Sequence, residues 1–122
     1  MKILVVGELN VDLILQDYSS FPTPGREVLV ERASLTLGSA SAICAAGLAR
    51  LGNEVAFSGK LGIDAWGDYI MGRLNELGID VSHVLRSAED TTGITVSVSS
   101  AADRALITYL GCSAGLHASE IQ

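Results

Sequence analysis

The chain has 122 residues, of which 48% are hydrophobic and 18% are charged, so it can build a hydrophobic core and is not a disordered segment. Its formal net charge is −6 and its Lys and Arg residues are scattered, which gives no electrostatic reason to bind nucleic acid or an anionic membrane. The opening MKILVVGELN is unlike a signal peptide, and no apolar run reaches the roughly 18–20 residues of a membrane span. We therefore expect a cytoplasmic protein.

The first third of the chain predicts three strands. Residues 2–7 (KILVVG) form a continuous apolar, β-branched run, typical of a strand buried on both faces at the centre of a parallel sheet. A second strand is predicted over 11–16, and a loop at 19–25 contains both prolines. Residues 26–36 partly alternate between apolar and polar, which indicates a strand with one solvated face and antiparallel pairing.

Two helices of different character follow. Residues 39–51 form an Ala-rich helix with almost no large side chain, whereas residues 65–77 are amphipathic. For the second helix we expect Asp64 to be the N-cap, rather than a ligand contact, and Gly78 to be the C-terminal stop. The remaining runs predict strands at 53–58, 81–86, 93–100 and 105–110, with a hairpin turn at 101–104. This alternation favours an α/β fold with a largely parallel sheet.

The last residues predict a helix that begins as the chain stops. Residues 111–115 (GCSAG) read as a loop, and residues 119–121 resemble the first turn of a further helix. One turn cannot support itself. We therefore expect the chain to be the N-terminal part of a longer α/β protein, and a frayed tail is the other interpretation.

Small residues near position 40 point to a small-molecule site. A loop of Gly, Ser and Ala at a helix N-terminus exposes backbone N–H groups that can bind polar or anionic ligands. Asp12 lies just past the first strand, and ligands of open α/β sheets bind outside the carboxyl ends of strands. Its carboxylate can accept hydrogen bonds from two hydroxyl groups. A turn residue at a strand edge is the alternative.

The other chemistry-bearing residues show no catalytic or metal-binding spacing. Cys44 and Cys112 lie in small, apolar contexts, so we expect buried free thiols. His83 and His117 have no partner spacing, and Lys60 is predicted to be a surface or helix-packing residue. The chain also lacks a G-x-x-x-x-G-K-[ST] phosphate-binding loop, and we assign no metal or cofactor site to it.

Five segments in matching order and spacing resemble the ribokinase-like (PfkB) family of carbohydrate kinases. They are GELNVD, the Pro24-Gly25 loop with the strand that follows, LGSASAICAAGLARLG with VAFSGKLGIDAWG, TTGITVSV, and RALITYLGCSAGL. The resemblance covers nearly the whole chain. It implies a mostly parallel sheet flanked by helices and carrying a small β lid, formed largely by residues 11–17 and 26–36. Residues 1–122 would be the N-terminal part of a single ribokinase-like domain.

The resemblance implies the acceptor-binding part of an ATP-dependent kinase that phosphorylates a hydroxyl of a sugar, a nucleoside or a related small polyol. Lids of this family often pair between subunits, so a homodimer is also implied. In the family, the ATP pocket, the catalytic base and the anion hole belong to the C-terminal half, with a D-T-x-G-A-G-D-type motif that this chain lacks. ATP and Mg²⁺ are therefore implied for the full-length parent, and we expect the chain alone to be inactive and not to bind them strongly.

The resemblance assigns acceptor-binding roles to several positions of this chain. Asp12, with Asn10 beside it, would bind sugar hydroxyls. Gly38 and Ser39 match a Gly-Gly pair whose backbone contacts the substrate, and an ordinary helix N-cap at Ser39 or Ser41 is compatible with that role. Two further glycines could line the sugar pocket or serve only turn geometry: Gly93 and Gly111.

Ile43 departs from the family pattern. It occupies the place where the family usually has an Asn that hydrogen-bonds a substrate hydroxyl. A buried hydroxyl left without that partner would lose about 1–3 kcal/mol of binding free energy. The acceptor is then less polar at that point or another residue supplies the contact, and ribose itself is disfavoured.

Two other function classes compete with this interpretation. A non-catalytic ligand-binding or regulatory protein on the same scaffold is motivated by Ile43 and by the missing C-terminal motif. A dinucleotide-binding oxidoreductase is disfavoured, because the first turn reads GELNVD rather than G-x-G-x-x-G and a strand follows it in place of a helix.

Overall fold

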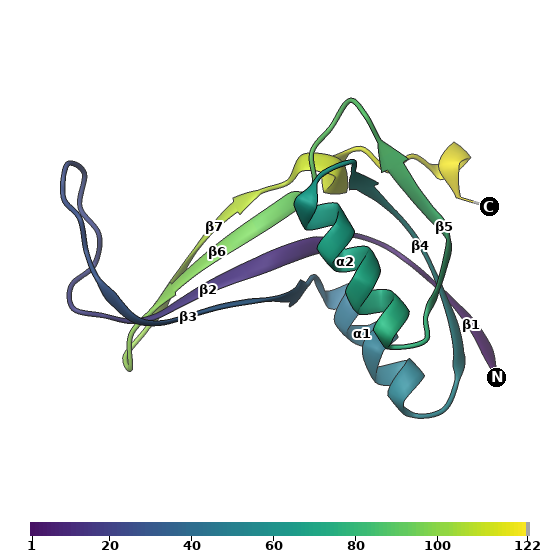
Figure 1. Ribbon diagram of the computed structural model, residues 1–122, viewed down its shortest axis with the longest axis horizontal. Helices are drawn as coiled ribbons and strands as arrows, with labels where there is room; N and C mark the ends of the chain where they lie inside the picture. Colours follow the sequence, from purple (N-terminus) through teal and green to yellow (C-terminus); the bar gives the residue numbers. More distant parts are fainter. Residues whose placement is uncertain (122) are drawn as a thin grey trace.

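The computed structural model describes residues 1–121 and contains two sheets, two α-helices and two short 3-10 turns (Figure 1). None of the helices described is long and apolar enough to cross a membrane. In chain order the elements are β1 (Lys2–Val6), β2 (Asn10–Tyr18), β3 (Val30–Gly38), α1 (Ala40–Arg50), β4 (Glu54–Gly62), α2 (Ala65–Glu76), β5 (Asp80–Ser87), β6 (Gly93–Ser99), β7 (Arg104–Tyr109), η1 (Gly111–Ala114) and η2 (Ala118–Glu120).

The first sheet is parallel, with strand order β1-β4-β5. Because the strands follow one another in one direction and such crossovers are right-handed, α1 and α2 lie on the same face (Figure 1). The core forms between these helices and the sheet, where Phe57, Leu61, Ile70 and Leu74 are fully buried. The predicted α/β fold with a parallel sheet is confirmed.

Local sequence accounts for both helices. The small residues of α1 let it approach the sheet closely, since Ala42 and Ala45 are fully buried. The Ser39 side chain caps α1 by accepting a hydrogen bond from the backbone N–H of Ala42 (3.1 Å). After α2, Gly78 adopts the left-handed conformation (φ 74°) that favours glycine, as predicted for the helix stop.

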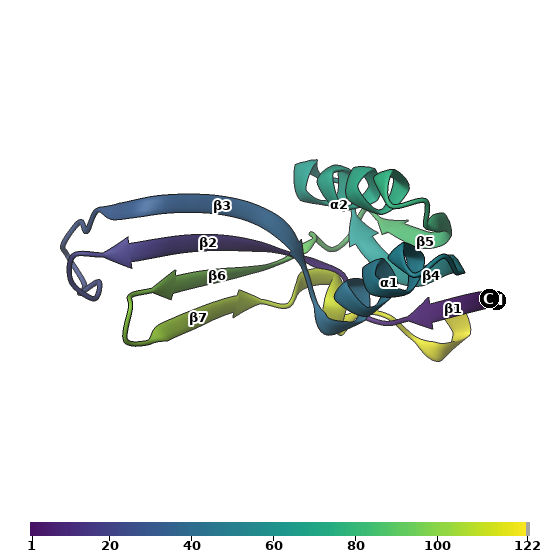
Figure 2. The ribbon, with the colours of Figure 1, turned by 90° about the horizontal axis from the view of Figure 1, so that it is seen from below.

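The second sheet has strand order β3-β2-β6-β7 and projects from the helices and the first sheet (Figure 2). The outer pairs β2-β3 and β6-β7 are antiparallel, and the central pair β2-β6 is parallel. The predicted lid segments fall in β2 and β3, but β3 begins at Val30, so residues 26–29 precede the strand. The predicted hairpin of β6 and β7 is confirmed, but the sequence did not predict that this hairpin joins β2 and β3 in one sheet.

Three sequence predictions are wrong. Strand β1 is an edge strand of the first sheet as described, with 46% of Leu4 and 42% of Val6 exposed, because only β4 pairs with it and the helices cover one face. Cys44 is exposed, since the buried side of α1 is the one that presents Ala42 and Ala45, whereas Cys112 is buried as expected. Residues 111–115, predicted as a loop, contain the 3-10 turn η1.

Candidate functional site

A groove of about 520 Å³ runs along one face of the second sheet. Side chains alternate between the two faces of a strand, so alternate residues of β2, β6 and β7 line it. Its inner end, near the helices, carries Asn10, Asp12 and Ser39 together with Thr95 and Thr108. We call this feature the acceptor groove.

The inner end of the acceptor groove is a connected row of polar side chains. Asp12 pairs with Thr95 in the β2-β6 register, and Thr95 pairs with Thr108 across β6-β7. The Asn10 amide donates hydrogen bonds to Oδ1 of Asp12 (3.1 Å) and to the Thr95 hydroxyl (3.4 Å), and the two Thr hydroxyls lie 3.0 Å apart. The structure therefore brings the two polar residues predicted from the sequence, Asn10 and Asp12, together with two threonines.

The close approach of Gly38 to this row leaves no room for a side chain at position 38. It pairs directly with Asn10, and a Cβ at Gly38 would lie 2.7 Å from Cγ of Asp12 and 2.9 Å from Nδ2 of Asn10. Real Cβ atoms do not approach so closely. The missing side chain leaves the room in which the Asp12 carboxylate sits.

Ser39 combines two roles. Besides capping α1 it lines the acceptor groove, and its hydroxyl donates to the carbonyl oxygen of Glu8 (2.6 Å). The Ser41 hydroxyl donates to the same carbonyl oxygen (2.8 Å). These bonds fix the start of α1 to the segment between β1 and β2, at the root of the second sheet.

The other three predicted site residues do not line the acceptor groove. Ile43 lies on α1 with 61% of its side chain exposed. A Cβ at Gly93 would lie 2.7 Å from the carbonyl oxygen of Leu110, and one at Gly111, where φ is 51°, would meet the carbonyl oxygen of Thr91. Both glycines thus have a packing reason at the root of β6 and β7.

Asp64 is the predicted N-cap of α2, which the structure confirms, and it also reaches the second sheet. Its carboxylate accepts hydrogen bonds from the backbone N–H of Gly67 (2.7 Å), from the backbone N–H of Thr92 (2.8 Å) and from the Thr92 hydroxyl (2.7 Å). Burial raises the pKa of Asp64, but these hydrogen bonds and the nearby Arg86 charge outweigh it and hold the pKa below its ordinary value. The N-cap of α2 is therefore also an anchor for the residue that precedes β6.

Other titratable residues lie away from the acceptor groove. Lys60 is mostly buried, forms an ion pair with Glu120 (3.2 Å) and donates to the carbonyl oxygen of Gly115 (3.0 Å), so it ties the last residues to β4. His83 lines a separate cavity of about 420 Å³ at the amino ends of the first sheet's strands, the end opposite to that at which α/β sheets bind ligands. Within residues 1–121 no group of three or more His, Cys, Asp or Glu side chains could hold a metal ion.

Sequence reasoning missed the groove residues of β6 and β7. Thr95, Ser97 and Ser99 alternate with apolar residues in TVSVS, a period-two signal for a polar face. The signal was present, but it does not show that this face continues the one that carries Asp12. That connection needs the parallel pairing of β2 with β6, which joins segments more than 80 residues apart.

Known proteins place the chain in a family. The model of the pfkB family carbohydrate kinases matches residues 1–122. A ribokinase of Haemophilus influenzae is 27% identical over 118 residues, which are 96% of this chain and 38% of that protein. A 2-dehydro-3-deoxygluconokinase of Bacillus subtilis is 42% identical over 59 residues, covering 48% of this chain and 18% of that protein.

A solved structure shows the same fold. The nucleoside kinase of Methanocaldococcus jannaschii, described as an archaeal member of the ribokinase family, matches with a TM-score of 0.79 at 24% identity, over 91% of this chain and 37% of that one. The chain thus spans well under half the length of these relatives. The match of the family model over all 122 residues establishes that this chain belongs to the pfkB family of carbohydrate kinases.

Proposed function

We propose that this chain is the acceptor-binding part of an ATP-dependent kinase that phosphorylates a hydroxyl group of a sugar, a nucleoside or a related small polyol. The observation that carries the proposal is the hydrogen-bonded row of Asn10, Asp12, Thr95 and Thr108 at the inner end of the acceptor groove. This row follows the carboxyl end of β1, where ligands of α/β sheets bind.

The donors and acceptors of this row suit a polyhydroxylated molecule. Among the hydrogen bonds of residues 1–121, only Oδ1 of Asp12 receives a side-chain donor, so Oδ2 can accept hydrogen bonds from acceptor hydroxyls. The Thr95 and Thr108 hydroxyls can each donate or accept. A carboxylate accepts stronger hydrogen bonds than a neutral oxygen does.

ATP and Mg²⁺ are implied by the family, but the residues of this chain do not fit them. The described residues offer no cluster of three or more metal-ligating side chains, and the sequence has no Gly-rich Lys loop. We propose that ATP, Mg²⁺ and the catalytic base belong to the further length that the relatives have, and that this chain alone is not catalytic. We also propose a cytoplasmic location for the protein.

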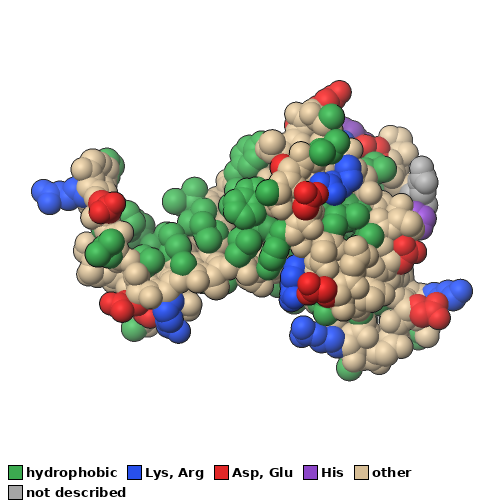
Figure 3. Space-filling view, viewed as in Figure 1, with side chains coloured by type: hydrophobic (Ala, Val, Ile, Leu, Met, Phe, Trp, Pro, Cys, Tyr) green, Lys and Arg blue, Asp and Glu red, His purple; other side chains and the backbone are tan. Residues whose placement is uncertain are grey.

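We also propose that the second sheet is a lid over the acceptor and that it pairs with the lid of a second copy. The face opposite the groove is apolar, with 67% of Ile107 and 51% of Tyr109 exposed. Figure 3 shows hydrophobic side chains gathered over this sheet beside α2. An apolar patch of this kind on a projecting sheet marks an interaction surface.

The proposal is tested by removing the Asp12 charge. The Asp12→Asn variant keeps the size of the side chain but replaces one acceptor oxygen with a donor, so we expect at least tenfold weaker binding of its best ligand from a panel of D-fructose, D-ribose, D-gluconate and adenosine. Binding is measured by NMR titration of the chain. Asp80→Asn, on β5 outside the groove, is the control and should bind as the unsubstituted chain does. Unchanged binding by Asp12→Asn would contradict the proposal.

The alternative is a non-catalytic ligand-binding protein on the same scaffold. It is favoured by Ile43, an exposed apolar residue in the family's Asn position. Both candidates predict binding that depends on Asp12. They differ in the full-length protein, which turns over ATP with the bound acceptor only if it is a kinase.

A further inference from the structure

The acceptor groove carries two charged side chains, one at each end. Asp12 lies in the inner row with Thr95 and Thr108, and Arg104 lies in the outermost row, opposite Ser99. Arg104 and Thr108 are four positions apart on β7, which is about 13 Å in an extended strand. The acceptor groove therefore carries a negative charge at the end near the helices and a positive charge at the far end of the sheet.

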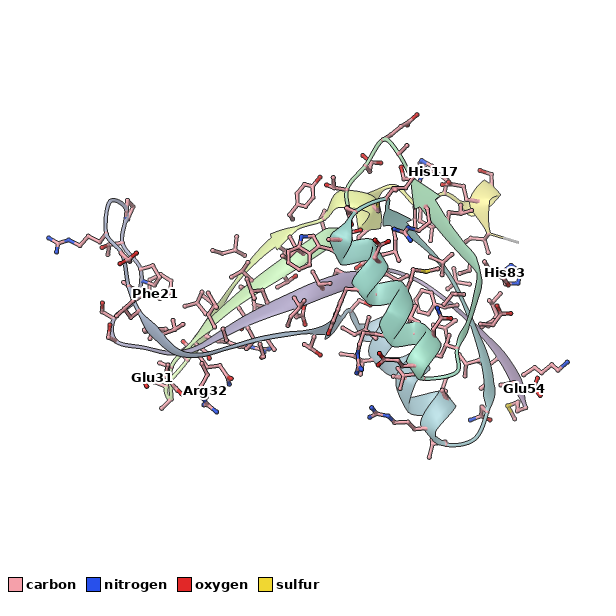
Figure 4. The ribbon with its side chains drawn as sticks, in the orientation of Figure 1. Phe21, Glu31, Arg32, Glu54, His83 and His117 are labelled. Atoms are coloured by element: carbon pink, nitrogen blue, oxygen red, sulfur yellow. The ribbon has the colours of Figure 1, made fainter. Side chains whose placement is uncertain are left out.

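The Arg104 side chain forms no ion pair among the residues that the structure describes. Residues 1–121 give its guanidinium neither an ion pair nor a hydrogen bond. The contrast is Arg32, which stands in the same cross-strand row at the other edge of the sheet (Figure 4). Arg32 donates to Oδ2 of Asp17 from both Nη2 (2.8 Å) and Nε (3.1 Å).

The turn before β7 holds the backbone at Arg104 and engages the carboxylate of Asp103. The Ser100 hydroxyl accepts hydrogen bonds from the backbone N–H groups of Ala102 (3.2 Å) and Asp103 (3.4 Å). Oδ1 of Asp103 in turn accepts from the backbone N–H of Arg104 (2.8 Å). The Asp103 side chain thus binds the backbone at Arg104 and does not pair with its guanidinium.

We propose that Arg104 binds a terminal oxyanion of the acceptor, so that the preferred acceptor class is a polyhydroxylated molecule carrying a carboxylate or phosphate. This rests on the proposed acceptor site. Guanidinium binds both groups through two parallel hydrogen bonds. The Asp12 carboxylate repels an anion from the inner end, which orients the hydroxyl end towards Asp12 and the oxyanion towards Arg104. Ile14 and Leu106 line the groove between them and suit a carbon chain.

The test uses three six-carbon ligands that differ only at C1: D-gluconate, D-glucitol 1-phosphate and neutral D-glucitol. NMR titration of the 122-residue chain measures the three affinities. We expect at least one oxyanion ligand to bind about tenfold more tightly than glucitol, the size of one charge-assisted hydrogen-bond pair in a partly exposed site. The ratio should shrink at high ionic strength. Gluconate and glucitol phosphate distinguish a carboxylate from a phosphate acceptor.

Variants assign the preference to Arg104. Arg104→Gln should lower the oxyanion preference to about one, Arg104→Lys should restore part of it, and Arg32→Gln should leave it unchanged. The inference is overturned if the unsubstituted chain shows no preference, if Arg104→Gln retains it, or if Arg32→Gln loses it equally. Glucitol binding that depends on Asp12 without an oxyanion preference overturns this inference alone, whereas absence of binding by all three ligands overturns the proposed function as well.

Discussion

The two sheets of this chain differ in what they contribute: the first carries most of the buried core, and the second carries the candidate site. The first sheet packs against two helices around fully buried side chains such as Phe57 and Leu74. The second sheet is a single layer, and its fully or nearly buried residues lie mainly at its inner end, as Val11 and Leu37 do. This thin sheet is therefore stabilised mainly at its inner end, and it carries a polar groove on one face. We expect substitutions in the first sheet to change mainly the free energy of unfolding, and substitutions in the second sheet to change mainly ligand binding.

The largest expected effect is on the core of the first sheet. Phe57→Ala removes a fully buried ring and should lower the free energy of unfolding by about 3–5 kcal/mol. Ile107→Ala in the second sheet is the control, because its side chain is mostly exposed and its loss should change that free energy by about 0.5 kcal/mol. Urea denaturation measures both.

A large loss for Ile107→Ala would break the comparison in an informative way. It would mean that the apolar face of the second sheet is buried in solution, as in the proposed pairing of lids. The midpoint of unfolding should then rise with protein concentration. A concentration-independent midpoint with a small loss for Ile107→Ala would contradict the homodimer.

The next effect concerns the anchor between α2 and the second sheet. Asp64→Ala leaves the N-terminus of α2 uncapped and removes both bonds to Thr92, so it should lower the free energy of unfolding by about 2 kcal/mol. Amide hydrogen exchange in β6 should accelerate more than in β4. Asp80→Asn, which alters an exposed carboxylate that accepts a hydrogen bond from the backbone N–H of Ser82, is the control for both measurements.

This anchor also has a pH dependence of defined sign. The folded-state pKa of Asp64 is lowered: burial raises it, but hydrogen bonds from Thr92 and Gly67 and the Arg86 charge prevail. The stabilisation is therefore present above the unfolded-state pKa of about 3.9 and disappears as the pH falls through the lower folded-state value. Asp64→Asn should flatten this acid limb of the stability curve, and an unchanged limb would show that other carboxylates produce it.

A smaller effect on stability and a larger one on binding are expected at Gly38. Gly38→Ala forces a Cβ against Asp12 and Asn10, which should displace the carboxylate, lower the free energy of unfolding by about 1–2 kcal/mol and weaken ligand binding by tenfold or more. Gly72→Ala is the matched control, since a Cβ there meets nothing within 4 Å and helix propensity favours Ala by about 0.5–1 kcal/mol. Equal ligand affinities in the two variants would remove Gly38 from the site.

The same division separates what the sequence predicts from what it does not. Local rules predicted the first N-cap at Ser39 or Ser41, of which Ser39 is the cap, the second at Asp64 and the stop at Gly78, because capping depends on a few neighbouring residues. The edge position of β1 was missed, because an apolar run shows that a strand exists but not how many neighbours it has.

The candidate site was predictable only in part. Asp12 stood out beside a strand end, and the family resemblance gave Asn10, Gly38 and Ser39. Thr95, Thr108 and Arg104 join them through strand register, which depends on pairing between distant segments and is not encoded in local pattern.

The smallest expected effect is on the ion pair at the outer end of the second sheet. Arg32 and Asp17 are both well exposed, so Arg32→Gln should lower the free energy of unfolding by less than about 1 kcal/mol, and less still at high salt. A double-mutant cycle with Asp17→Asn isolates the pair. The ion pair also bears on ligand specificity. In the Asp17→Asn variant Arg32 loses its partner, so a second unpaired guanidinium stands in the row of Arg104. If this variant gains affinity for oxyanion ligands, the ion pair with Asp17 is what keeps Arg32 from the ligand, and unchanged affinity would show that only Arg104 reaches the ligand.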